Sequence, residues 1–279
     1  MPSRRFIQCD VFSPIPCQGN GLAVVVDADG LDSAGMQRFA AWTNLAETSF
    51  LFPPTEAGAD YRVRIFTPNR EMPFAGHPTL GSCAAWLHAG GRPAAAGIVR
   101  QECGIGIVDI DVSIAVSPAF AAPPTRIAPL EASRLEAIQN ALAIASAQVV
   151  RSARLENGPV WQVLELDSAE AVLAVDSSRV RWPAFDPIGL LGPHAHGSGI
   201  DVEVRMLAPS SGMSEDPITG SLNAALAQWM HAEGRLTGPM TVAQGTAIGR
   251  VGRVQVRPEA GRIWIGGQTH VLIDGVVDL

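Results

Sequence analysis

Gly76 and His77 lie at the junction between a proline-containing loop and a segment of small residues, 79–87. Pro78 suits the first turn of a helix, because its missing N–H group would have no helical partner there. The free N–H groups and the positive dipole end of such a helix favour an anion beside His77. The sequence therefore predicts an anion-binding helix start at this point.

A second loop of the same kind leads to Gly220 and Ser221. Gly76-His77 matches Gly220-Ser221 at a spacing of 144 residues, and a helix of small residues is expected after each. Earlier matches keep a constant spacing of 141 residues: Val63-Arg64 with Val204-Arg205, Pro68 with Pro209, and Met72 with Met213. Chance among abundant small residues is the alternative explanation. Because the matches keep their order through both parts of the chain, we interpret it as two structurally similar halves.

Glu47 is the carboxylate with the least ordinary surroundings. An amphipathic helix is expected over 33–43, with Met36, Phe39, Ala40 and Trp42 near helical spacing, and 48–52 alternates like a strand. A capping-box acid paired with Asn44 is the structural explanation, but the strand pattern that follows makes it a poor one. Burying an unpaired carboxylate is costly, so one at the junction of a helix and a buried strand needs either a binding partner or a functional role.

The two helix starts and Glu47 together suit the transfer of a proton to and from a carbon atom. A carboxyl group enclosed away from water can remove a proton and return it on the same face. Two helix starts facing one cleft would supply the donors that a developing enolate needs. Neither a metal nor an organic cofactor is required for this chemistry.

The basic residues exclude other chemistries. All 20 of them are arginine, so a lysine Schiff base, pyridoxal-phosphate catalysis and a Walker A loop are excluded. No GxGxxG motif follows a strand and opens a helix, so a Rossmann site is unsupported. His194 and His196 could hold a metal, but no third ligand is evident, and we expect no metal site.

Composition and charge describe a globular protein. With 47% apolar residues over 279 positions, the chain can bury a substantial core. The net charge of −7 and the lack of a basic stripe argue against a nucleic-acid partner. We expect no signal peptide and no membrane span, since the aliphatic runs are only strand length. The four cysteines have no CxxC spacing, which favours reduced thiols and a cytoplasmic location.

The domain organisation follows from a linker rich in proline and alanine, 117–125. We expect an N-terminal half-repeat, 1–117, and a C-terminal half-repeat, 118–279. In the second half a helix is expected near 130–145, strands near 149–154 and 160–166, and three short strands with glycine turns over 241–276.

With these motifs in place, the chain resembles the phenazine biosynthesis-like PhzF family, which has the diaminopimelate-epimerase-like fold. The matching pieces span nearly the whole chain in the family's order: Asn44-Leu45-Ala46-Glu47-Thr48, Phe66-Thr67-Pro68 with 73–81, Glu215-Asp216-Pro217 with Thr219-Gly220-Ser221, Gln244-Gly245 with Gly249-Arg250, and Gly266-Gly267. One departure is Gly21, where the family commonly has proline after asparagine.

The resemblance implies an α/β fold of the α+β type. It has two similar domains, each a curled, mostly antiparallel sheet around a central helix, and the active site lies in the interdomain cleft. The related fold allows the final strand, about 271–277, to pack back on the first domain. The resemblance also suggests a homodimer.

The resemblance also implies roles for the residues singled out above. Glu47 maps onto the family's acid/base glutamate, and Asp216 and His77 onto its catalytic partners. Ser221, with Gly76 and Gly220, maps onto substrate binding. Related epimerases use two thiols at the helix starts. Here Cys83 lies several residues inside its helix, so a two-thiol racemase is disfavoured.

The sequence therefore predicts a cofactor-independent isomerase that acts on a small carboxylated or amino-acid-like metabolite. The alternatives are a catalytically idle cleft protein that binds a small anion or a partner, and a cofactor-free lyase or hydratase. Ile218 and Leu222-Asn223 are bulkier than is usual around the second loop, so the substrate stays open.

Overall fold

The structure of this chain is a computed structural model that describes residues 2–209 and 213–279. The chain forms two compact units. Unit 1 is Met1–Ala121 with Gly266–Leu279, and unit 2 is Ala122–Ile265. The first boundary lies after residue 121, where the sequence suggested 117, and the last fourteen residues, which include the final strand, lie in unit 1.

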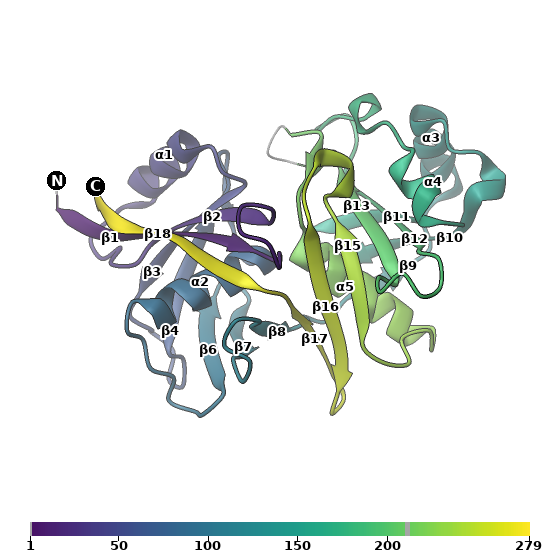
Figure 1. Cartoon of the computed structure of the whole chain (residues 1–279). Coiled ribbons are helices and arrows are strands. Elements are labelled where there is room, and N and C mark those ends of the chain that lie inside the picture. The colour runs from purple at the N-terminus through teal and green to yellow at the C-terminus, as the bar shows by residue number, and fades with distance from the viewer. Residues whose placement is uncertain (1, 210–212) are drawn as a thin grey trace. The chain divides into compact units, whose positions relative to one another are not determined.

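Unit 1 is a sheet that packs around a helix (Figure 1). Its pairing order is β18–β1–β2–β3–β4, then β6–β7–β8, and only β2–β3 and β4–β6 are parallel. The elements are β1 (Ser3–Val11), β2 (Asn20–Val25), α1 (Ser33–Thr43), β3 (Glu47–Phe52), β4 (Tyr61–Phe66), β5 (Glu71–Met72), α2 (Gly76–His88), β6 (Ile98–Cys103), β7 (Gly106–Asp111), β8 (Ala119–Ala121) and β18 (Thr269–Asp278).

Helix α2 is central to unit 1 because its residues are small. Nine of its thirteen residues are buried. A Cβ atom at Gly81 would lie 2.5 Å from a methyl carbon of Leu22 and 3.0 Å from one of Val11. Glycine therefore lets the helix approach β1 and β2 more closely than any other residue could.

Helix α1 packs with its aromatic face on the same unit. Met36, Phe39 and Ala40 are buried and form a cluster with Phe50, Phe52 and Phe66. The prediction that Trp42 belongs to this face is wrong in part: its ring stacks on Phe39 at 5.9 Å, but the residue is 79% exposed.

The final strand belongs to unit 1. β18 pairs antiparallel with β1 from Ser3, opposite Asp278, to Val11, opposite Thr269, with a register shift between Gln8 and Cys9. The first and last strands of the chain are therefore neighbours in one sheet, and β18 is longer than the expected strand 271–277.

Unit 2 is similarly built around a helix, α5 (Gly220–Ala232), which also has nine buried residues among thirteen. Its other elements are β9 (Arg126–Ala128), α3 (Ala132–Leu142), β10 (Val149–Glu156), β11 (Val160–Leu166), α4 (Ala169–Leu173), β12 (Ile188–Pro193), β13 (Val202–Leu207), β14 (Glu215–Asp216), β15 (Met240–Gln244), β16 (Gly252–Glu259) and β17 (Arg262–Gly266), with short 3-10 turns at Ser146–Gln148, Ser177–Arg179 and Thr246–Ile248. The predicted α+β class, with two similar domains that each surround a central helix, is confirmed.

One feature of the sheets recurs in both units. β4 pairs antiparallel with β5 and parallel with β6, and β13 pairs in the same way with β14 and β15. The registers correct one sequence match. Met72 lies opposite Ile65 and Asp216 opposite Met206, so Met72 corresponds to Asp216 and not to Met213.

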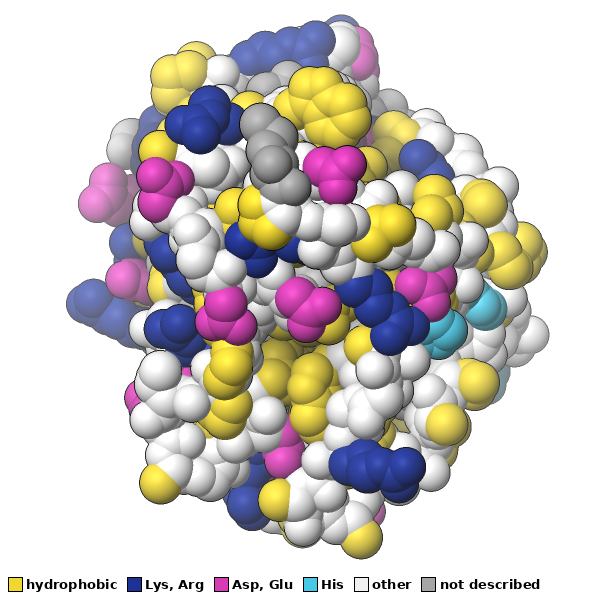
Figure 2. All heavy atoms as spheres, turned by 90° about the vertical axis from the view of Figure 1, so that its left-hand side faces the viewer, with side chains coloured by type: hydrophobic (Ala, Val, Ile, Leu, Met, Phe, Trp, Pro, Cys, Tyr) yellow, Lys and Arg dark blue, Asp and Glu magenta, His cyan; other side chains and the backbone are white. Residues whose placement is uncertain are grey.

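Charged side chains of both signs are interspersed over the face shown in Figure 2. Within the described ranges, none of the helices combines the length and the apolar character that a membrane crossing needs.

Candidate functional site

In unit 1, His77 is the second residue of α2, and the preceding N-cap residue, Ala75, has no polar side chain with which to cap the helix. Gly76 and His77 are both buried. The helix therefore begins as the sequence predicts, with its first N–H groups not capped by the N-cap side chain.

Two other side chains meet His77. Its Nε2 lies 3.4 Å from Oε2 of Glu47, the first residue of β3. Its Nδ1 lies 3.3 Å from Nδ2 of Asn20, the first residue of β2. The structure thus brings Glu47 and His77 together, and adds Asn20 to them.

The His77 ring is neutral at physiological pH. Burial lowers the pKa of His77 to about 3, against a smaller opposing effect of the Gly21 backbone carbonyl. The contact with Glu47 is consequently one between a neutral imidazole and a carboxyl group, not an ion pair. The Glu47 side chain is 18% exposed, but its Oε2 atom, which faces His77, is buried.

In unit 2, Asp216 ends β14 and precedes the start of α5 by a few residues. Its Oδ2 accepts a 2.5 Å hydrogen bond from the hydroxyl of Thr219, the N-cap residue of α5. The Thr219 side chain thus binds Asp216. Asp216 is buried, with 8% exposure.

Ser221 takes the place in α5 that His77 has in α2. Its carbonyl oxygen accepts a hydrogen bond of 2.8 Å from Asn157, which in turn accepts one of 2.9 Å from the Trp161 indole. Asn157 is therefore beside the helix start in unit 2, as Asn20 is in unit 1. The shared Asn-Gly pair at 20–21 and 157–158 was the only sequence signal for these two residues.

His194, one of the two histidines considered as metal ligands, has an acidic partner. His194 Nε2 lies 2.9 Å from Oε2 of Glu203, which is 1% exposed. Within residues 2–209 and 213–279, no three histidine, cysteine or acidic residues are grouped so that they could hold a metal ion.

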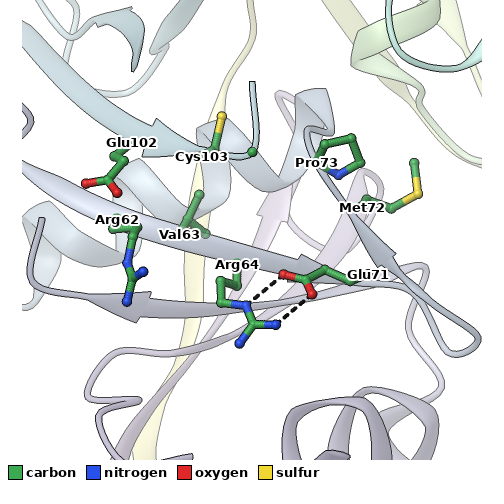
Figure 3. Close-up of a pocket in the computed structure, with 9 residues that line it drawn as sticks. Arg62, Val63, Arg64, Glu71, Met72, Pro73, Glu102 and Cys103 are labelled. Atoms are coloured by element: carbon green, nitrogen blue, oxygen red, sulfur yellow. Dashed lines mark hydrogen bonds and ion pairs between the residues drawn. The ribbon is translucent and has the colours of Figure 1, made fainter. Parts of the chain in front are cut away.

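Unit 1 also contains a hollow of about 510 Å³ in its sheet (Figure 3). It opens where β5 and β6 both flank β4, and Val63, Met72, Pro73 and Cys103 contribute to its apolar lining. Arg64 and Glu71 form a bidentate ion pair at its rim, with distances of 2.7 and 2.6 Å. No sequence pattern had indicated this hollow.

Comparisons with known proteins agree with this fold. The model of the family described as phenazine biosynthesis-like protein, PhzC-PhzF, matches residues 9–275. The chain is 33% identical to the Schizosaccharomyces pombe protein "Antisense-enhancing sequence 1", with 99% of each chain covered. It is 30% identical to the trans-2,3-dihydro-3-hydroxyanthranilate isomerase of Pseudomonas fluorescens, over 88% of this chain and 87% of that one.

A solved structure shows the same fold. The PhzF-family phenazine biosynthesis protein of Bacillus anthracis superposes with a TM-score of 0.82 over 100% of both chains, at 22% identity. At that identity the likeness establishes the fold alone. The family model that matches residues 9–275, with the relatives that are 30–33% identical over at least 87% of each chain, shows that this chain belongs to the phenazine biosynthesis-like PhzC-PhzF family.

Proposed function

We propose that this chain is a cofactor-independent isomerase that moves a proton on a small carboxylated or amino-acid-like metabolite. The observation that carries the proposal is the placement of the Glu47 carboxyl 3.4 Å from a neutral, buried His77 at the start of α2. A carboxyl in reach of a helix start can exchange a proton with a substrate whose anionic group that helix start binds.

In the proposed reaction, Glu47 removes a proton from one carbon and returns it to another. The negative charge that develops on the substrate is stabilised by backbone N–H groups at the starts of α2 and α5. His77 stays neutral and donates or accepts a hydrogen bond without changing charge. Asp216 assists the proton transfer, and Ser221, with Gly76 and Gly220, binds the substrate.

The substrate class is supported by the relatives. The Pseudomonas fluorescens relative is by name an isomerase of trans-2,3-dihydro-3-hydroxyanthranilate. We propose a small substrate of that kind for this chain, with a carboxylate held by the helix starts. Since the proposed chemistry needs only these side chains, no metal or organic cofactor takes part in it.

Three further properties belong to this proposal. The common pairing of β4 and β13 with their neighbours supports an internal repeat. Four free cysteines support a cytoplasmic location. β18 exposes Leu272, Ile273 and Val276, which supports a homodimer formed through this strand. Light scattering at micromolar concentration tests the dimer, and a monomer alone would contradict it.

The test of the function is a screen of small carboxylates in deuterated water, followed by NMR. An isomerase produces a rearranged product with incomplete label, because one sheltered carboxyl takes and returns the proton. Binding without turnover would identify an idle anion-binding protein, and loss or gain of water would identify a lyase or hydratase.

The variant Glu47→Gln keeps the shape of the side chain but removes the base. We expect turnover to fall about 10²- to 10⁴-fold, with a much smaller change in substrate affinity. Glu136→Gln, on the exposed side of α3, is the matched control and should leave turnover unchanged. Wild-type turnover in Glu47→Gln would contradict the mechanism.

A further inference from the structure

Gln244 is the last residue of β15, and its side chain is fully buried. Its Oε1 accepts hydrogen bonds from the Thr219 backbone N–H at 3.1 Å and from Asn223 Nδ2 at 2.8 Å. Its Nε2 donates to the Thr219 hydroxyl at 3.0 Å and to the Asp216 carbonyl at 3.3 Å. One side chain thus joins β15, β14 and the start of α5.

The orientation of the Gln244 amide follows from these contacts. A backbone N–H group can only donate, so the atom that faces the Thr219 N–H must be the amide oxygen. The amide NH₂ group then faces the Thr219 hydroxyl and the Asp216 carbonyl, both of which can accept. The usual ambiguity between the oxygen and nitrogen of a glutamine is therefore resolved by the backbone.

The direction of the next hydrogen bond follows in turn. The Thr219 hydroxyl has one proton, and it accepts from Gln244 Nε2. Its own proton is therefore free to point at Asp216 Oδ2, 2.5 Å away. The chain of donors runs from Gln244 through Thr219 to the Asp216 carboxylate, which is its final acceptor.

We infer that Gln244 and Thr219 are positioning residues that hold Asp216 as an oriented carboxylate. A donated hydrogen bond from a buried hydroxyl favours the charged form of a carboxyl group, and such charge-assisted bonds are short. The inference rests on the proposed function for the role of Asp216 in turnover, but the hydrogen-bond chain itself depends only on unit 2.

The test compares Thr219→Val with Thr219→Ser. Valine keeps the shape and loses the hydroxyl, so kcat should fall about 10-fold or more while KM changes little, as expected for a lost hydrogen bond to a charged group. Serine keeps the hydroxyl and should restore most of kcat. Thr241→Val, on β15 with its hydroxyl at the surface, is the matched control and should behave as the wild type.

A second measurement does not depend on turnover. The carboxyl carbon resonance of Asp216, identified with Asp216→Asn, should move in Thr219→Val and return in Thr219→Ser. One Gln244 side-chain amide proton should also exchange faster with solvent in Thr219→Val. Gln244→Glu keeps the size of the side chain and removes the donor, and should reproduce the effect on Asp216.

The outcomes separate the two claims. If the resonances respond as expected but no substrate is turned over by the wild type, the isomerase proposal fails and the hydrogen-bond chain stands. If Thr219→Val leaves both kcat and the Asp216 resonance unchanged, or if Thr219→Ser is as impaired as Thr219→Val, the inference is wrong.

Discussion

In each unit one strand, β4 or β13, pairs antiparallel with one neighbour and parallel with another. The space beside that strand is filled differently in the two units. In unit 2 the space beside β13 contains the Gln244 side chain, which binds Thr219 and Asp216. In unit 1 the equivalent space beside β4 is the hollow of about 510 Å³, where Cys103 and Met72 occupy the positions of Gln244 and Asp216 (Figure 3). The same backbone plan thus supports a hydrogen-bonded loop in one unit and an open one in the other.

Each unit has an arginine–glutamate ion pair, and the two pairs differ in how deeply they are buried. Arg205 and Glu215 are 3% and 0% exposed, whereas Arg64 and Glu71 are 26% and 42% exposed. Arg205 also donates to the carbonyls of Val172 and Val175 at the end of α4, at 3.0 and 2.6 Å. Similar folds in the two units therefore do not imply similar energetics, because the sequence decides which unit is fixed by buried polar contacts.

Removing the buried arginine should have the largest effect. We expect Arg205→Met to lower the free energy of unfolding by about 3–5 kcal/mol, because it leaves the Glu215 carboxylate buried without its partner. Arg64→Met should cost at most about 1 kcal/mol, since its pair is solvated. Guanidinium chloride unfolding of both variants measures the difference, and similar losses would contradict the comparison.

The second largest effect should be the pH dependence of the free energy of unfolding. The pKa of His77 is about 3 in the folded protein and 6.5 in the unfolded chain, so only the unfolded chain binds this proton between those values. Stability from this residue is therefore complete above pH 6.5 and is lost as pH falls towards 3, at up to about 1.4 kcal/mol per pH unit.

His77→Gln should show a shallower loss over the same range. Urea unfolding at pH 7.5, 6.5, 5.5 and 4.5 measures both slopes, and the remaining histidines contribute equally to each protein. Ser221, at the matching position of unit 2, cannot titrate in this range, so Ser221→Ala should keep the wild-type slope. Parallel slopes for wild type and His77→Gln would show that the pKa of His77 is the same in the folded protein and the unfolded chain, which would contradict this prediction.

Thiol reactivity should give the smallest effect and tests whether the hollow is open. Cys17 is exposed, whereas burial raises the pKa of Cys9 to about 12 and also raises that of Cys83. Burial raises the pKa of Cys103 too, but this thiol lines the hollow. We expect an aromatic disulfide reagent at pH 8 to label Cys17 first, Cys103 more slowly, and the other two only on unfolding.

Peptide mapping identifies the labelled thiols, and Cys17→Ser removes the fast phase as a control. If Cys103 reacts only on unfolding, as Cys83 does, the hollow is not open to a small reagent and the contrast between the units is weaker than described.

Local sequence patterns predicted the elements well where residues close in sequence determine them. The strand at 160–166 has the predicted bounds, and α2 and α5 begin at Gly76 and Gly220 as expected. α4 and β12 were not predicted. The constant spacing that paired Met72 with Met213 was misleading, since the registers place the extra residues of the second loop before Glu215.

The contacts around the candidate residues could not be read from the sequence. Asn20 and His77 are 57 positions apart, and Gln244 is 25 positions from Thr219. Each contact depends on which strands are neighbours and in what register, and periodicity carries no such information. The motif Gln244-Gly245 could be seen in the sequence. The contacts of Gln244, however, could be identified only once β13 was known to pair with both β14 and β15.

The pairing of β1 with β18 has a consequence for synthesis. The ribosome makes β1 first and β18 last, whereas unit 2 is continuous in the chain and is complete when residue 265 has been added. Since domains generally fold as units during translation, unit 2 can fold while one edge of β1 still waits for its partner strand. A nascent chain that stops before Thr269 would therefore contain a folded second unit and a β1 strand with one unpaired edge, which is open to pairing with other chains.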